Sequence, residues 1–325
     1  MSISRTIWDL FRESLRLYGL LVRIVLPVML LSRIAVELGV VESLAPLFAP
    51  VMRLMGLPPE LGFAWVACVF VGLWGGAAAA FAMVDIAALS TAQVTVFASM
   101  MLMAHALPIE QRIVQKAGPG LVSTTLFRMA GTFLYAFLLS WFYSATGWLA
   151  EPATVIWAPE ARTDDGWTAF AIDTALSLFW MFVILFGLLL LMRMMDVTGI
   201  NQRLTRMLAP VLRIAGIAPQ ATALTMVGVL LGLAYGGGLI LREAQAGHLA
   251  PRDIFQSLAF MGLCHSLIED TLFMLALGAD ISGVLIGRVL FTLAVMALVA
   301  RLLPRIPEPI FFRFLYNNTA PQPAT

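Results

Sequence analysis

Two short clusters of polar residues interrupt long apolar stretches of the chain. Each begins with a histidine: His105 with Glu110 in the first cluster, and His265 with Ser266, Glu269 and Asp270 in the second. Ionisable side chains are costly inside a membrane and mostly functional there, and histidine with carboxylates can hold a polar solute or carry a proton. The clusters therefore predict a binding site for a small polar or anionic solute, with a proton or sodium as a candidate coupling ion.

Two other interpretations of these clusters stay open. Each histidine and acid could be structural, with its polar atoms satisfied by a neighbouring helix. His265 and Glu269 are four residues apart, so on a helix they share a face, and with the adjacent Cys264 they could ligate a metal. The chain has no HExxH motif and no cysteine pair at metal-site spacing to support this. We therefore expect no resident metal and no cofactor.

An arginine follows each cluster at the same distance. Arg128 lies beyond His105 as Arg288 lies beyond His265, and each falls in the next apolar stretch. A buried arginine pairs with a carboxylate or holds an anionic ligand. Pairing with the acidic clusters is the favoured prediction, and help in holding an anionic solute is the alternative.

The two clusters occupy matched positions in an internal repeat with a fixed offset. Residues 39–128 align without a gap on 199–288, and eighteen of these ninety positions are identical. The block LFAPVMRLMGLPP at 47–59 lies over MLAPVLRIAGIAP at 207–219. Apolar composition alone would not place proline, glycine, histidine and arginine in one register. In membrane transporters such repeats often form a site near the bilayer midplane.

The composition is that of an integral membrane protein. Of the 325 residues, 61% are hydrophobic and only 12% are charged, about half the charged fraction of a soluble domain. The mean hydropathy is +0.92, and runs such as 171–195 and 281–303 are long enough to span a bilayer. The net charge of +1 gives no sign of a nucleic-acid partner. We predict an all-α polytopic membrane protein.

Charge and composition divide the chain into five parts. These are an amphipathic segment at 1–16, repeat one at 17–147, an acidic linker at 148–173, repeat two at 174–303 and a tail at 304–325. The arginine-bearing ends predict cytoplasmic termini, and the acidic linker predicts a periplasmic position. Each repeat must then cross the membrane an odd number of times, so the repeats have inverted topology.

Each repeat holds four apolar stretches, so one stretch should enter the membrane and return. The candidates are 60–84 and 220–241, because both carry a glycine cluster that could form the tip of a re-entrant hairpin. The expected tip residues are Gly75 and Gly76 in repeat one, and Gly236 and Gly237 in repeat two. A straight helix with small residues at a helix contact is the alternative. Amphipathic stretches at 43–56 and 203–216 predict interfacial helices before the hairpins.

The polar clusters fall midway along the third apolar stretch of each repeat. Pro108 removes a backbone donor and should break the first of these helices, and the repeat implies a break in the second. In inverted repeats, both broken helices and both hairpin tips converge near the midplane. The predicted solute site therefore combines the two clusters with the four glycines.

The paired APVxRxxGxxP blocks, the glycine-tipped segments and CHSLIEDTLFMLALGA at 264–279 resemble nucleoside recognition (gate) domain proteins. That domain is similar to parts of concentrative nucleoside transporters, of the ferrous iron permease membrane region and of spore maturation membrane proteins. The resemblance covers nearly the whole chain. It implies an interfacial helix, a re-entrant hairpin, a broken helix and a spanning helix in each repeat, with solute held by the hairpin tips and the broken helices.

We expect a secondary transporter in the bacterial inner membrane that carries a nucleoside-like or carboxylate solute by alternating access. The alternatives are a membrane scaffold that transports nothing and a permease for divalent metal such as ferrous iron. No GxxxxGK[ST] or GxSxG motif occurs, so an ATP-driven pump and an enzyme are not expected. The expected partners are the lipid bilayer and the solute, with a second copy of the chain as a further candidate.

Overall fold

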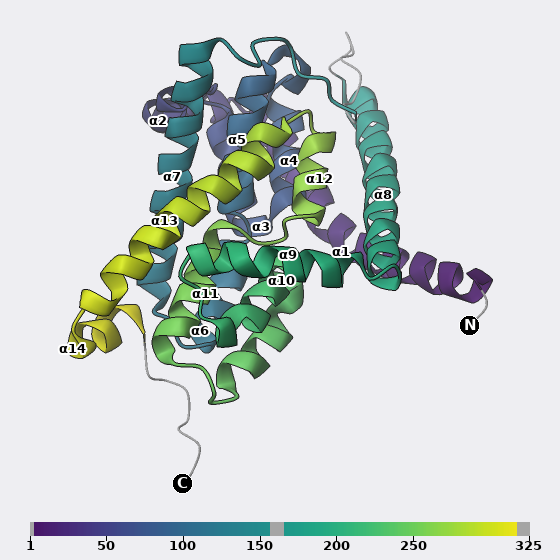
Figure 1. Cartoon of the computed structure of the whole chain (residues 1–325). Helices are drawn as coiled ribbons and strands as arrows, with labels where there is room; N and C mark the ends of the chain where they lie inside the picture. Colours follow the sequence, from purple (N-terminus) through teal and green to yellow (C-terminus); the bar gives the residue numbers. More distant parts are fainter. Residues whose placement is uncertain (1–2, 157–165, 317–325) are drawn as a thin grey trace.

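The computed structural model describes residues 3–156 and 166–316, and the described chain is almost entirely helical (Figure 1). The helices of the first half are α1 (Ile3–Glu37), α2 (Val40–Leu54), α3 (Leu61–Val71), α4 (Leu73–Met83), α5 (Thr91–Met103), α6 (Leu107–Lys116) and α7 (Leu121–Thr146). Those of the second half are α8 (Trp167–Val197), α9 (Ile200–Ile214), α10 (Thr222–Gln245), α11 (Pro251–Leu263), α12 (Glu269–Ala276), α13 (Arg288–Leu302) and the short α14 (Glu308–Ile310). Single turns lie at 86–88 (η1), 219–221 (η2) and 303–305 (η4), and wider π turns at 282–287 (η3) and 311–315 (η5).

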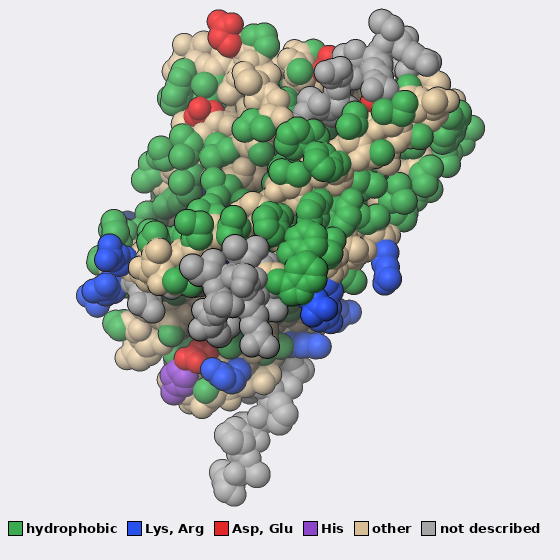
Figure 2. Space-filling view, turned by 90° about the vertical axis from the view of Figure 1, so that its right-hand side faces the viewer, with side chains coloured by type: hydrophobic (Ala, Val, Ile, Leu, Met, Phe, Trp, Pro, Cys, Tyr) green, Lys and Arg blue, Asp and Glu red, His purple; other side chains and the backbone are tan. Residues whose placement is uncertain are grey.

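Five helical stretches of the described chain are long and apolar enough to cross a membrane. They are Leu10–Glu37, Thr91–Lys116, Leu121–Thr146, Trp167–Met195 and Ser282–Arg305. Figure 2 shows a broad apolar surface with acidic side chains at its upper end and basic side chains gathered below it. The predicted fold class, an all-α polytopic membrane protein, is confirmed.

Corresponding helices of the two halves run in opposite directions. In Figure 1, α7 rises from the lower end of the molecule to the upper end, and α13 descends from the upper end to the lower. Likewise α8 runs downward, whereas α1 starts at the right, level with the lower end of α8, and leads to α2 at the upper left. The two halves are therefore inverted relative to each other, as the charge pattern predicted.

Each half contains a hairpin whose two arms lie side by side. A Cβ atom added at Gly76 would lie 2.4 Å from Cys68 Cβ, although a straight helix separates such residues by about 12 Å. In α10, a Cβ at Gly236 would lie 2.9 Å from Val227 Cγ1, nine residues earlier. Both segments therefore fold back on themselves, and the predicted hairpins are confirmed in preference to straight helices.

The tips of the hairpins are not at the predicted glycines. The chain turns at Gly72 (φ 113°) and at Gly232 (φ 78°), conformations that only glycine adopts at low cost. Gly75 and Gly76 lie in the first turn of α4, and Gly236 and Gly237 lie in the second arm of α10. There they allow close packing, since a Cβ at Gly237 would lie 2.8 Å from Ile113 of α6. The prediction of these four glycines as tip residues was wrong.

The second part of each broken helix packs in the core of the opposite half. The cluster built around α3, α4 and α5 includes Phe273 and Met274 of α12. The cluster built around α10 and α11 includes Val114 of α6, with Ile113 packed against it. The two halves are therefore interlocked, and neither closes its core alone.

Two boundaries differ from those expected. Residues 3–16 form no separate amphipathic helix, because α1 continues unbroken from Ile3 to Glu37. At 35 residues it is about 52 Å long and exceeds the hydrocarbon core. The helix α8 begins at Trp167, inside the segment expected to be linker.

The described part of that linker is anchored, since the Ala153 N–H donates to the Leu89 carbonyl (2.9 Å). Residues 157–165 and 317–325 lie outside the described residues.

The hairpin predicts a strong difference between two glycine substitutions. Gly76→Ala should destabilise the protein by about 1–3 kcal/mol, because the new methyl group collides with α3. Gly238→Ala is the matched control: nothing lies within 4 Å of its Cβ position. There alanine should be neutral or stabilising by up to about 1 kcal/mol. Thermal unfolding in one detergent measures both, and equal effects would contradict the hairpin packing.

The inverted arrangement predicts opposite sides for two exposed positions. Single cysteines at Glu151 and Arg305, in a chain whose Cys68 and Cys264 are replaced, should react with a membrane-impermeant thiol reagent from opposite faces of the cell membrane. A membrane-permeant reagent should label both and controls for reactivity. Labelling of both positions from one face would contradict the topology.

Candidate functional site

Both broken helices are interrupted by a strained residue held by a hairpin. Ala106 and Ser266 occupy equivalent positions in the repeat, and both have φ of 47°, which is unfavourable for residues with a side chain. The Ala106 N–H donates to the Cys68 carbonyl (3.0 Å), and the Ser266 N–H donates to the Gly228 carbonyl (3.2 Å). Cys68 and Gly228 are likewise equivalent positions in the repeat. Each hairpin therefore fixes the break of its own half in the same way.

The two breaks meet at a pair of histidines. His105 Nε2 lies 3.2 Å from His265 Nε2, and both side chains are buried. Each ring is held through its other nitrogen, since His105 Nδ1 lies 3.1 Å from the Met101 carbonyl oxygen and His265 Nδ1 lies 2.7 Å from that of Met261. The break of one repeat thus touches the break of the other directly.

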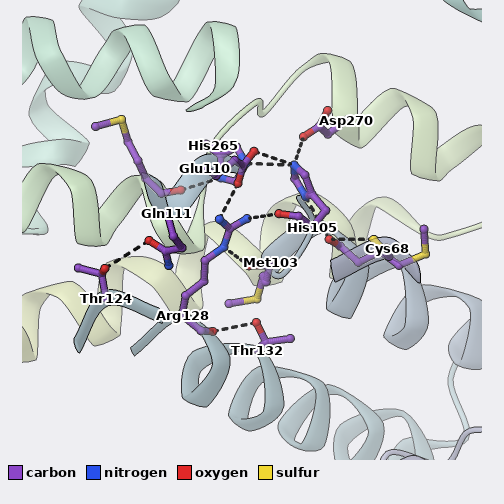
Figure 3. Close-up of polar contacts among 12 residues, drawn as sticks. Cys68, Met103, His105, Glu110, Gln111, Thr124, Arg128, Thr132, His265 and Asp270 are labelled. Carbon is purple, nitrogen blue, oxygen red and sulfur yellow. Dashed lines mark hydrogen bonds and ion pairs between the residues drawn. The ribbon is translucent and has the colours of Figure 1, made fainter. Parts of the chain in front are cut away.

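A buried ion pair adjoins the histidines on the side of repeat one. Arg128 Nη1 donates to Glu110 Oε2 (2.5 Å), and both side chains are at most 2% exposed (Figure 3). Arg128 also donates from Nε to the Met103 carbonyl (2.6 Å) and from Nη2 to the His105 carbonyl (3.3 Å). Glu110 lies in the first turn of α6, where the helix dipole favours a negative charge. The predicted pairing of Arg128 with the first cluster is confirmed.

The second half lacks the equivalent ion pair. Arg288 is fully buried and donates from Nη2 to the His265 carbonyl (2.7 Å), as Arg128 does to that of His105. Among the described residues, its Nε and Nη1 have no partner. Asp270 Oδ2 instead lies 3.7 Å from His105 Nε2. Aspartate is one methylene shorter than Glu110, which contacts both its arginine and the opposite histidine. The predicted pairing of Arg288 with an acid was wrong.

The predicted site residues fall into two groups. His105, His265, Glu110 and Asp270 come together, as Figure 3 shows. Ser266 is buried beside a hairpin tip, with its Cβ 3.4 Å from the Cβ position of Gly232. Glu269 is partly buried at the start of α12, and no hydrogen bond or ion pair joins it to the histidines in the described chain. Gly75, Gly76, Gly236 and Gly237 lie along the hairpin arms.

Sequence reasoning missed two features of the site. It gave no sign that His105 would contact His265 as well as Glu110 of its own cluster. It also missed the tips at Gly72 and Gly232, although these are identical in the repeat, whereas Gly75 lies over Tyr235. Identity in the repeat does not single out the tips, because Gly76 and Gly236 are identical in register as well.

Comparison with known proteins supports the assignment of this chain to a membrane. YvoD of Bacillus subtilis (strain 168), an uncharacterized membrane protein, is 25% identical over 271 residues, which cover 82% of this chain and 85% of the relative. No protein-family model matches the chain, and no solved structure matches it. The resemblance to nucleoside recognition proteins therefore stays a prediction.

The unequal arginines predict unequal effects of the same substitution. Arg128→Met should destabilise the protein by about 3–5 kcal/mol, because it leaves the buried Glu110 carboxylate without a cation. Arg288→Met should lower the stability much less. Two buried donors of Arg288 have no partner, and each such donor costs about 1–3 kcal/mol in the wild-type protein, so their removal offsets part of the loss. Thermal unfolding of the two variants in the same detergent tests this. A larger loss from Arg288→Met would contradict the asymmetry.

Proposed function

We propose that this chain is a secondary transporter of the bacterial inner membrane, with both termini in the cytoplasm, that moves a small polar or anionic solute by alternating access. The observation that carries this proposal is the contact between the breaks of two inverted helices. That contact gathers His105, His265, Glu110, Asp270 and two buried arginines in an interior that is mostly apolar. Transporters with inverted repeats form their sites where discontinuous helices meet.

The unpaired guanidinium group supports an anionic solute. Arg288 offers two donor nitrogens in the interior, in the position where repeat one supplies a carboxylate to Arg128. A buried cation without an anion is expensive, so a carboxylate or similar anion would be strongly favoured there. A solute carboxylate would take the role in repeat two that Glu110 has in repeat one.

The backbone of the site supports movement. Ala106 and Ser266 are held in an unfavourable conformation by single hydrogen bonds from the hairpins. Strain of this kind costs about 1–3 kcal/mol per residue and favours elements with two arrangements. The two cores are interlocked, and Gly237 of the α10 hairpin packs on Ile113 of α6. A movement of the α10 hairpin must therefore carry α6, the second part of the broken helix of repeat one, with it.

The solute class can be tested by thermal unfolding of the purified protein in detergent with nucleosides, nucleobases and small carboxylates such as succinate. A ligand at one hundred times its Kd should stabilise the protein by about 2.7 kcal/mol. We expect a carboxylate to do so, and Arg288→Met to abolish the effect. Arg213→Met, which removes an exposed arginine of α9, is the control and should keep the response.

A second measurement separates a transporter from a scaffold. In a chain without Cys68 and Cys264, a cysteine placed at Ser266 should react with impermeant thiol reagents from both faces of the membrane, because alternating access exposes it to each in turn. A static scaffold would expose it to neither. The transport proposal fails if no compound in the panel stabilises the protein and the cysteine at Ser266 stays unreactive.

A further inference from the structure

Three atoms at the contact of the broken helices form a nearly equilateral triangle. His105 Nε2 and His265 Nε2 are 3.2 Å apart, and each lies 3.4 Å from Glu110 Oε1. Ligand atoms 2.0–2.1 Å from a tetrahedral zinc ion are about 3.3–3.4 Å from one another. This ligand triangle therefore has the dimensions of one face of a tetrahedral metal site.

The hydrogen bonds of the two rings direct lone pairs into the triangle. A carbonyl oxygen can only accept, so Nδ1 of each ring carries the hydrogen that bonds to Met101 or Met261. In the neutral rings, both Nε2 atoms then hold lone pairs directed toward one another. Two lone pairs this close repel, and either a shared proton or a metal cation between the rings relieves the repulsion. The backbone thus prepares both histidines as acceptors for a cation.

The groups behind the triangle are those that support metal ligands. Metal-binding histidines usually donate their second N–H to a carbonyl, and metal-binding carboxylates are themselves hydrogen-bonded. Here both histidines do so, and Arg128 holds Glu110 through Oε2, which leaves Oε1 directed at the histidines. The three ligand atoms are therefore fixed before any ion binds.

The Asp270 carboxylate lies beside the triangle, where it can supply a fourth ligand atom. Its Oδ2 lies 3.7 Å from His105 Nε2, and suitable ligand atoms of His105, His265 and Asp270 all lie within 4.8 Å of one another. Two imidazole nitrogens with carboxylate oxygens suit zinc and its transition-metal neighbours, whereas magnesium and calcium prefer oxygen alone.

We propose that this chain binds a first-row transition-metal dication of the zinc type between His105, His265 and Glu110, with Asp270 as the fourth ligand. The ligands come from both repeats, so the ion joins the two broken helices at their breaks. The site differs from the one the sequence pointed to, because neither Cys264 nor Glu269 takes part. It departs from the expectation of no resident metal, which the sequence alone favoured. Binding requires no transport, so the inference goes beyond the proposed function.

The test uses the full-length protein, purified in detergent and freed of metal with a chelator. Titration with Co²⁺ should give the intense visible absorption of a tetrahedral cobalt site at one ion per chain, and Zn²⁺ should abolish it.

His105→Gln and His265→Gln should each weaken binding by at least about 100-fold, more than the loss of a supporting group. Asp270→Asn, a smaller change, should weaken it about 10-fold. His248→Gln is the matched control, because the exposed His248 pairs with Glu243 and contributes no atom to the triangle.

Each outcome decides the proposal. Wild-type protein that unfolds cooperatively but gives no visible cobalt absorption overturns it, whatever the variants do. Binding lost in His248→Gln but kept in His265→Gln assigns the ion to the surface and overturns it as well. If a histidine variant fails to fold, the Asp270→Asn titration decides, because unchanged affinity there contradicts the fourth ligand. A chain that binds cobalt but responds to no carboxylate keeps this inference and loses the anion-transport proposal.

Discussion

The rest of the structure depends on how the chain satisfies backbone groups that two interrupted helices leave without partners. A helix that stops in an apolar interior leaves its last carbonyls unbonded, and no water is at hand to satisfy them. Here the carbonyls before each break accept from side chains: Met101, Met103 and His105 in and after α5, and Met261 and His265 in and after α11. The donors are the buried histidines and arginines. The residues that suggest chemistry are thus also those that make the breaks possible.

This double role explains why the site is compact and why it joins the halves. The histidines use Nδ1 for their own helices and direct Nε2 at each other, so the same hydrogen bonds that cap α5 and α11 also orient the cross-repeat contact. The exchange of α6 and α12 between the two cores strengthens that connection. A movement that separated the histidines would have to repack both cores, so the two breaks are mechanically coupled.

Much of this architecture could be predicted from the sequence, because the repeat and the charge pattern constrain it from two directions. The inverted order, the hairpins, the breaks and the pairing of Arg128 all follow from residue type and register. The tips were misplaced because glycine serves two purposes: Gly72 supplies a turn, whereas Gly76 supplies close packing, and composition does not separate them. The contact of His105 with His265 depends on how the halves dock, a three-dimensional relation that no spacing along the chain encodes.

The one-methylene difference between Glu110 and Asp270 has a consequence for the balance between conformations. In a molecule built from two identical inverted halves, exchanging the conformations of the halves would cost no free energy. Only repeat one, within the described chain, holds a buried carboxylate–guanidinium pair, and Arg288 keeps two nitrogens without partners. The two exchanged arrangements are therefore not degenerate. Under the alternating access proposed above, the duplicated chain has an intrinsic resting orientation, and the length of one acidic side chain contributes to it.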